Sequence, residues 1–121
     1  MQIRTIKKND IEIAAVNSEE MLISDVQSAL DFMVTVQYKT GCNRIILNKS
    51  AIGEEFFHLS TKIAGEILQK FVNYRVKFAV VGDFSSYVSE SMKAFILECN
   101  RGKDIFFLPD EEKAVEKLST V

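Results

Sequence analysis

The sequence has few of the residue types that divide a chain into parts. Of its 121 residues only one is proline, Pro109, and five are glycine. Clusters of these residues mark turns and linkers, and the sequence has neither such clusters nor repeats nor low-complexity runs. Since domains of about 100–150 residues are the commonest, we predict one domain over residues 1–121.

Long apolar runs are also missing. No stretch approaches the roughly 18 apolar residues of a transmembrane helix, and the start MQIRTIKKND lacks the apolar segment of a signal peptide. Hydrophobic residues make up 47% of the chain and charged residues 26%, which is typical of a soluble globular domain. We therefore expect a cytoplasmic protein with no membrane partner.

Cysteine and histidine are too sparse to suggest a metal centre or a catalytic triad. Cys42 and Cys99 lack CxxC spacing and a histidine neighbour, so we expect two reduced thiols. His58 is the only histidine, and neither Glu54 nor Ser60 completes a triad with it at helical spacing. We predict that His58 lies on the solvent side of a helix, and we expect no catalytic residue, cofactor or metal.

The charges do not form the pattern of a nucleic-acid binder. The chain has 15 Lys and Arg against 17 Asp and Glu, a net charge of −2, and its basic residues are scattered. Nucleic-acid binding requires a basic face or stripe. We therefore expect no nucleic-acid partner.

The strands are predicted from two kinds of apolar pattern. Residues 2–7 and 10–16 alternate apolar and polar side chains on either side of Lys8-Asn9-Asp10, which indicates a β-hairpin. Residues 44–47, 76–81 and 105–108 are continuous apolar runs. Such runs are typical of parallel strands that are covered on both faces, so we place them in a central sheet.

Four amphipathic segments are predicted to be helices. The first covers residues 25–39, is capped by Ser24 and Gln27, and ends at Gly41. The second covers residues 54–73, the third covers residues 86–101 and ends at Gly102, and the fourth begins at residue 110. Gly65 within the second suggests close packing on the sheet, and Arg101 suggests an ion pair with a glutamate. We expect Phe78, Val80, Phe95 and Phe106 in the core, together with helix residues that share an apolar face: Val26, Ala29, Leu30, Met33, Val34, Val88, Met92, Ile96 and Cys99.

The resulting order of elements is β-β-α-β-α-β-α-β-α. It predicts the α/β class, with an N-terminal hairpin leading into a mostly parallel sheet flanked by four helices. Three separated blocks, AGEILQKF at 64–71, VVGDF at 80–84 and ECNRG at 98–102, resemble a bacterial family known as domain of unknown function 4180. This resemblance covers nearly the whole chain and implies no particular activity.

The order of elements also resembles that of STAS domains, the fold of anti-sigma-factor antagonists. That resemblance implies binding to a protein partner, switched by phosphorylation of a Ser or Thr at the start of the helix after a central strand. The Asp-Ser-Ser/Thr-Gly signature of those proteins is missing from NKSAIGEEFFHLSTKIAG, which follows the strand ending at Leu47. By analogy the modified hydroxyl is expected to be Ser50, Ser60 or Thr61.

A binding site is expected where strands end and helices begin, as in other open α/β sheets. Gly82, Asp83, Ser85 and Ser86 occupy such a position. Ser85 or Ser86 can bind an anion at a helix start or serve as an N-cap, and Asp83 can contact a ligand or orient the loop. The same loops contain one base, Lys49, and many carboxylates: Glu19, Glu20, Asp25, Glu54, Glu55, Asp83, Asp110, Glu111 and Glu112.

These carboxylates have two possible origins, a hard-cation site around Asp83 or the preference of acids for helix N-termini. Two functions therefore stay open. The first is a noncatalytic regulatory or interaction module that binds a protein through the strand-to-helix loops. The second is a ligand-binding or metal-binding protein or small enzyme with its site around Asp83. A shallow apolar patch at Ile52, Phe56 and Phe57 would favour the first, and a deep pocket beside Asp83 the second.

Overall fold

The computed structural model, which describes residues 1–121, contains one five-stranded sheet in the order β1-β2-β3-β4-β5. The first strand, β1 (Gln2–Lys8), runs antiparallel to β2 (Ile11–Asn17). The others, β3 (Arg44–Asn48), β4 (Lys77–Val81) and β5 (Ile105–Leu108), run parallel to β2. The predicted α/β class, with a hairpin leading into a mostly parallel sheet, is therefore confirmed.

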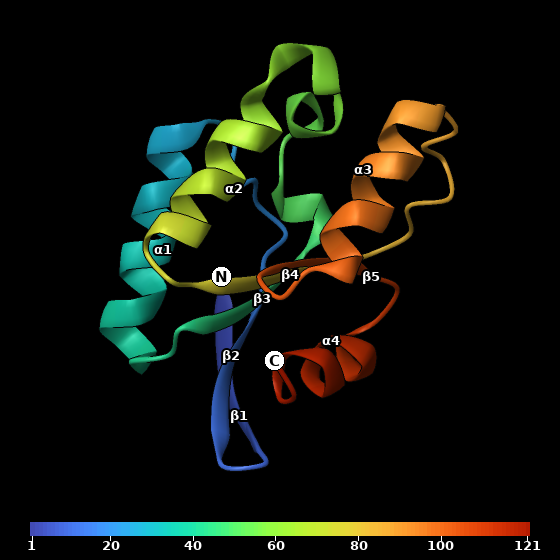
Figure 1. The fold of residues 1–121 in the computed structure, drawn as a ribbon. Helices are drawn as coiled ribbons and strands as arrows, with labels where there is room; N and C mark the ends of the chain where they lie inside the picture. The colour runs from blue at the N-terminus through green and yellow to red at the C-terminus, as the bar shows by residue number, and fades with distance from the viewer.

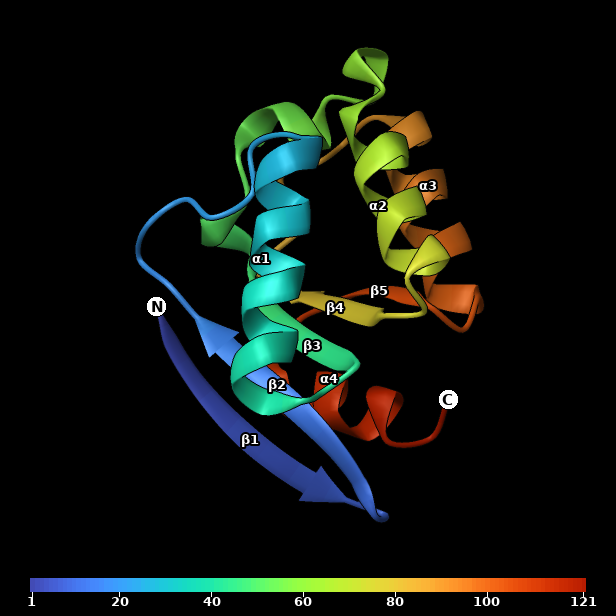
Figure 2. The same ribbon diagram turned by 90° about the vertical axis from the view of Figure 1, so that its left-hand side faces the viewer.

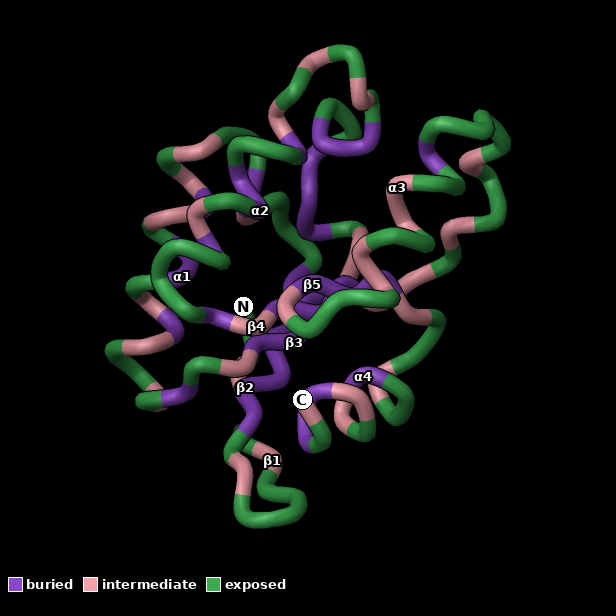
Figure 3. The backbone as a smooth tube through the Cα atoms, viewed as in Figure 1, coloured by how far each residue is buried: buried purple, intermediate pink, exposed green.

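Four α-helices cover the two faces of the sheet unequally (Figures 1 and 2). The helices α1 (Val26–Thr40), α2 (Ile63–Asn73) and α3 (Glu90–Arg101) lie on one face, and α4 (Glu111–Leu118) lies on the other. The core under the first three holds 24 buried residues, and the core under α4 holds six, which include Phe106 and Leu118. Figure 3 shows β3 and β4 buried between these layers. None of the helices has the length and apolar character needed to cross a membrane.

The hairpin turn follows the expectation from its residues. Asn9 (φ 53°) and Asp10 (φ 63°) both adopt left-handed backbone. Two such residues match the twist of the flanking strands. The turn end of the hairpin extends beyond the rest of the sheet and is exposed (Figures 2 and 3).

The predicted first helix is correct in extent, but its N-cap is a different residue. Asp25, not Ser24, accepts the backbone N–H of Ser28 (2.8 Å), and the Ser28 hydroxyl accepts the N–H of Asp25 (3.0 Å). This reciprocal pair satisfies two donors at the helix start. Gly41 ends the helix in left-handed geometry (φ 73°), as predicted. Val34, expected in the core, is exposed.

The predicted helix over residues 54–73 is wrong in its first half. The α-helix begins only at Ile63, and three 3₁₀ turns precede it: η1 (Lys49–Ala51), η2 (Glu54–Phe57) and η3 (Leu59–Thr61). Two adjacent side chains, Phe56 and Phe57, are both buried here, and consecutive residues do not share one face of an α-helix. Lys62, in left-handed backbone (φ 64°), separates the turns from the helix.

Three smaller predictions for this region also need correction. His58 is exposed but lies between two 3₁₀ turns and not on a helix. Ser60 and Thr61 lie outside α2, where the Thr61 hydroxyl donates to the carbonyls of Glu55 (3.0 Å) and His58 (2.8 Å). Gly65 is exposed, and a Cβ built on it meets no atom within 4 Å, so it does not mediate close packing on the sheet.

The helix after β4 starts later than predicted. Ser89 is its N-cap and accepts the Met92 N–H (3.2 Å), so neither Ser85 nor Ser86 caps it. Val88 precedes the helix and is 73% exposed, contrary to the prediction. Met92 is the one fully buried side chain of α3, and the expected core residue Phe95 is half-buried.

A side chain of α3 covers the outer edge of the sheet. Asn100 Oδ1 accepts the Phe107 N–H (2.7 Å), and Asn100 Nδ2 donates to the Phe107 carbonyl (3.1 Å). Because β5 is the last strand, this side chain takes the place of a further strand at Phe107. Arg101 is exposed and forms no ion pair, so the predicted Arg101–Glu pair is wrong.

Candidate functional site

The carboxyl ends of β3 and β4 surround an open depression of about 640 Å³. We call it the strand-end depression. It is lined by residues from the loops that follow these strands and from the segment before α1: Met21, Asn48, Lys49, Ser50, Ile52, Glu54, Val81, Gly82 and Asp83. The strand order follows the chain order without reversal. Crevices of open α/β sheets form where the order reverses, and this sheet has no such point.

Asn48 fixes one wall of the strand-end depression. Its Nδ2 donates to the Ser18 carbonyl (2.7 Å) and to the Ser50 hydroxyl (2.6 Å), and its Oδ1 accepts the Ser18 N–H (2.8 Å). The Ser18 hydroxyl in turn accepts the N–H of Glu20 (3.0 Å). These bonds join the ends of β2 and β3, so this part of the site has little freedom to rearrange.

Asp83 lies at the rim, as its position after β4 predicted. It is exposed, and its Oδ1 accepts the backbone N–H of Ser85 (2.9 Å). A hydrogen bond from the Ser85 side chain, this backbone bond and the charge of Lys49 lower the pKa of Asp83 below its ordinary value. Asp83 is therefore ionised at neutral pH. Ser85 and Ser86 do not line the depression.

Lys49 crosses from one loop to the other over a cluster of aromatic rings. Its Nζ lies 4.6 Å from the ring centre of Tyr87 and 5.8 Å from those of Phe57 and Phe84. An ammonium this close to a ring face is attracted by the π electrons. Gly82 makes the approach possible, because a Cβ built on it would lie 2.6 Å from the Cβ of Lys49.

Tyr87 connects the aromatic cluster to the acidic rim. Its ring stacks on Phe57 with centres 5.0 Å apart, and its hydroxyl lies 3.5 Å from Glu54 Oε2. Burial raises the pKa of Tyr87 above its ordinary value, although Lys49 acts in the opposite direction. The phenol is therefore neutral at physiological pH and donates to the Glu54 carboxylate.

The structure separates the three predicted phosphorylation positions. Ser50 is exposed, lines the strand-end depression and accepts the hydrogen bond from Asn48. Ser60 is exposed on η3, and Thr61 is half-buried there. Only Ser50 thus lies in the same site as Asp83.

The apolar patch that would favour an interaction module is not exposed. Ile52, Phe56 and Phe57 are all buried, with at most 4% of each residue accessible. The one exposed large apolar side chain of the site is Met21, whose Sδ lies 3.2 Å from a Cβ built on Gly53. The depression beside Asp83 is wide and open. The site therefore has neither the exposed apolar patch that would favour an interaction module nor the deep pocket that would favour a ligand site.

Carboxylates form a rim around the carboxyl ends of the strands. Eight of the nine predicted there are exposed, and none of the eight is in an ion pair: Glu19, Glu20, Asp25, Glu54, Glu55, Asp83, Asp110 and Glu112. The ninth, Glu111, pairs with Arg4. Besides Lys49, two exposed bases lie close to rim residues in the chain: Lys62, just before α2, and Lys113, in the first turn of α4. No three of the His, Cys, Asp and Glu side chains are grouped so that they could hold a metal ion.

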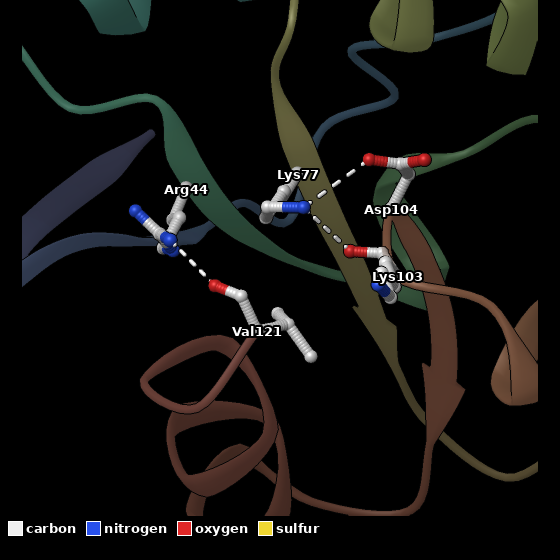
Figure 4. Close-up of polar contacts among 5 residues, drawn as sticks. All are labelled: Arg44, Lys77, Lys103, Asp104 and Val121. Carbon is white, nitrogen blue, oxygen red and sulfur yellow. Dashed lines mark hydrogen bonds and ion pairs between the residues drawn. The ribbon is translucent and has the colours of Figure 1, made fainter.

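Two of the basic residues at the opposite end of the sheet contact the protein itself (Figure 4). The basic residues at or next to the amino ends of β3, β4 and β5 are Lys39, Arg44, Arg75, Lys77, Arg101 and Lys103. Arg44 Nη2 donates to the Val121 carbonyl (2.6 Å). Lys77 Nζ donates to the Lys103 carbonyl (2.8 Å) and pairs with Asp104 (3.2 Å). The molecule is thus polarised along its strands.

The sequence pattern identifies Asp83 but not three residues whose contacts shape the site. Asn48 directly follows an apolar run, and an amide at a strand end is the one signal that could have singled it out. The pattern marks Lys49 only as a base and places Tyr87 at a helix start. The contact between Lys49 and Tyr87 joins residues 38 positions apart, so local pattern alone does not reveal it.

Comparisons with known proteins give one match. No curated protein and no solved structure matches the chain. A family model matches residues 8–118, which is nearly the whole length. The chain therefore belongs to the family described as "Domain of unknown function (DUF4180)".

Proposed function

We propose that the protein is a noncatalytic interaction module that binds a basic segment of a partner protein at the strand-end depression. The observation that carries this proposal is the rim of eight exposed carboxylates without ion-pair partners at the carboxyl ends of the strands, of which Glu54 and Asp83 line the depression. A surface of one charge sign attracts partners of the opposite sign and raises their rate of association.

Helix capping accounts for only part of this rim. Asp25 and Asp110 are N-caps, and Glu112 lies in the first turn of α4, where the helix dipole favours acids. Glu19 and Glu20 lie between β2 and α1, and Glu54 and Glu55 lie on the 3₁₀ turn η2. These four carboxylates are not at the start of any α-helix, so their placement supports a role in recognition.

The polar groups of the depression support binding more than catalysis. Asn48 is committed to Ser18 and Ser50, Asp83 to the Ser85 backbone, and the ammonium of Lys49 lies over the Tyr87 ring. Nucleophilic catalysis needs a nucleophile with a base in hydrogen-bonding reach. The Ser50 hydroxyl contacts an amide, which cannot serve as that base.

Met21 adds an apolar contact to this charged surface. It is exposed at the edge of the strand-end depression, and methionine adapts its shape to different partners. A lysine or arginine of a partner could lay its aliphatic stem on Met21 and place its charge beside Glu54 and Asp83. A basic segment therefore fits both the charge and the apolar part of the site.

A second candidate, a small-ligand site around Asp83, is favoured by one observation. The volume of about 640 Å³ lies within the range of ligand sites. An activity screen with metals supplied, together with native mass spectrometry of protein from its host, tests this candidate. Turnover or a bound small molecule that is lost in Asp83→Ala would favour the ligand site over the protein partner.

In-cell photocrosslinking tests the leading proposal. A photoreactive residue at Glu55 reports on the acidic rim, and the same residue at Lys103 on the opposite end is the matched control. We expect one crosslinked protein at position 55, attached through a Lys/Arg-rich segment and absent at position 103. Crosslinks at 103 alone, or attachment through acidic segments, would contradict the proposal.

A further inference from the structure

The outer side of α1 carries a stripe of exposed side chains. Gln27, Asp31, Val34 and Tyr38 are all exposed and follow one another at intervals of four, three and four residues. This is the spacing of the contact seam between two packed helices. The helix α1 lies at the end of its layer (Figure 1), and the side chains of this seam are exposed, so a partner can reach them.

The stripe combines a protrusion with a hollow. Tyr38 is 86% exposed, and a nearby groove of about 470 Å³ is lined by four apolar and four polar residues: Leu30, Met33, Val34, Tyr74, Gln27, Asp31, Thr35 and Gln37. Val34 and Tyr74 are themselves 62% and 60% exposed. Exposed tyrosines and apolar grooves mark surfaces that bind proteins.

The charges on α1 make this face complementary to itself. Asp31 lies one turn before Val34, and Lys39 lies just over one turn after it; both are exposed. Two antiparallel copies of α1 related by a two-fold axis near Val34 and Thr35 would place Asp31 of one copy opposite Tyr38 of the other, with Lys39 next to it on the flank of the helix. In the same arrangement each Tyr38 meets the partner's groove, because Leu30, Asp31 and Val34 line it.

We propose that the α1 face binds the same face of a second copy of this chain, forming an antiparallel, two-fold symmetric dimer. Tyr38 of each copy enters the groove of the other, and Asp31 pairs with Lys39 across the interface. Contacts of this reciprocal kind are the commonest in homo-oligomers. The surface is separate from the strand-end depression, so the inference does not rest on the proposed function.

The dimer is expected to dissociate on dilution. The helix α1 has 15 residues and is therefore about 22 Å long at ~1.5 Å per residue. Stable interfaces cover roughly 800 Å² on each partner, and the face of a single helix, roughly 10 Å wide, is smaller than that. We expect sedimentation equilibrium of the wild-type chain to show a concentration-dependent rise from 13.7 kDa to twice that mass.

Two charge variants test the pairing of Asp31 with Lys39, and a mixture of the two distinguishes a lost pairing from a lost fold. Asp31→Lys places lysines opposite each other in its homodimer, and Lys39→Asp places aspartates opposite each other. Each variant alone should raise the dimer dissociation constant by about tenfold or more, since the substitution occurs twice in the dimer. An equimolar mixture of the two should form a heterodimer, because position 31 of each copy then faces the opposite charge at position 39 of the other.

Two further variants show whether the α1 face itself forms the contact. Leu97→Glu removes an exposed apolar residue on α3, away from the stripe, and should leave the dissociation constant unchanged. Tyr38→Ala, with circular dichroism to confirm folding, should weaken the dimer like the charge variants. A wild-type chain that stays monomeric up to its solubility limit, or a mixture that does not restore association, would overturn the proposal.

Discussion

Lys49 and Gly82 show how single residues hold the two loops of the strand-end depression together. The lysine supplies a charge over three rings, and the glycine supplies the space in which its stem lies. The arrangement couples the segment before α2 to the segment before α3. Its stability therefore depends on a close approach of backbone and side chain at residue 82.

Gly82→Ala should destabilise the fold. The added methyl would lie 2.6 Å from the Lys49 Cβ, which is too near the backbone to move freely. We expect the free energy of unfolding to fall by about 1–3 kcal/mol, as for other overpacked sites. Gly65→Ala is the control; its methyl meets nothing, so the helix should gain up to about 1 kcal/mol. Urea melts of both variants measure the effect, and equal shifts in the two would contradict it.

Cys99 should react slowly with thiol reagents in the folded protein. Burial, with a smaller contribution from Glu98, raises the pKa of its thiol to about 11, so little thiolate exists at pH 8. The folded state favours the neutral thiol; the stability that follows is present at neutral pH and is lost as the pH rises through about 11. Alkylation at pH 8, followed by mass spectrometry with and without urea, checks this. Labelling of Cys99 as fast in the native protein as in urea would contradict it.

At the scale of elements, the helices differ in how firmly they are attached. The helices α1 and α2 bury large side chains such as Phe32 and Phe71, whereas Met92 alone is fully buried in α3. Asn100 compensates for this by bonding α3 to the backbone of β5. The edge of the sheet thus depends on one amide side chain.

Asn100→Ala should destabilise the protein and expose the edge of β5. It removes two hydrogen bonds and leaves the N–H and carbonyl of Phe107 unpaired, for which we expect about 1–3 kcal/mol. An uncovered edge strand also promotes aggregation. Asn73→Ala, which removes only an exposed bond from Gln69, is the matched control. Urea melts and light scattering should separate the two variants; if Asn73→Ala aggregates equally, the role assigned to Asn100 is wrong.

The elements also show which patterns in the sequence were informative. The hairpin was predictable from the alternation of apolar and polar side chains, and the parallel strands were predictable from continuous apolar runs. The order of the helices was predictable because residues such as Gly41 mark where a helix ends. The segment 54–62 was not, because the Phe56-Phe57 pair resembles part of an apolar helix face until the backbone is known. Likewise Asp83 was predictable from its place after β4, whereas the contact of Lys49 with Tyr87 depends on packing between distant loops.

At the scale of the whole molecule, two unequal cores hold one sheet between them. The larger core includes Phe71 and Phe78, whose rings stack with centres 4.3 Å apart, and both residues are completely buried. Phe95, which was expected to be equivalent, is only half-buried on α3. Stability should therefore be concentrated between α2 and the sheet.

Phe78→Ala should cost about 3–5 kcal/mol, which is much of the ~5–15 kcal/mol that stabilises a typical domain. Phe95→Ala, with the same change of side chain at a half-buried site, should cost clearly less. Paired urea melts compare the two. A Phe95 variant as unstable as the Phe78 variant would contradict the assignment of the core.

The molecule is polarised, with unpaired carboxylates at one end of the sheet and basic residues at the other, where Arg44 and Lys77 contact the protein itself. The proposed function follows from this polarity. It requires that the acidic rim, and not the net charge of −2, provides the attraction. Two pairs of exposed glutamates allow that distinction: Glu54 and Glu55 on the rim, and Glu12 and Glu116 away from it.

The most direct test is the affinity of the purified crosslinked segment for three forms of the protein, measured by titration calorimetry at fixed salt. Glu54→Lys with Glu55→Lys should weaken binding by about tenfold relative to the wild type, since two reversed contacts at about 0.7 kcal/mol each change the binding free energy by about 1.4 kcal/mol. Glu12→Lys with Glu116→Lys makes the same change in net charge and should leave the affinity nearly unchanged. Equal losses in both double variants, or none in either, would contradict recognition at the strand-end depression.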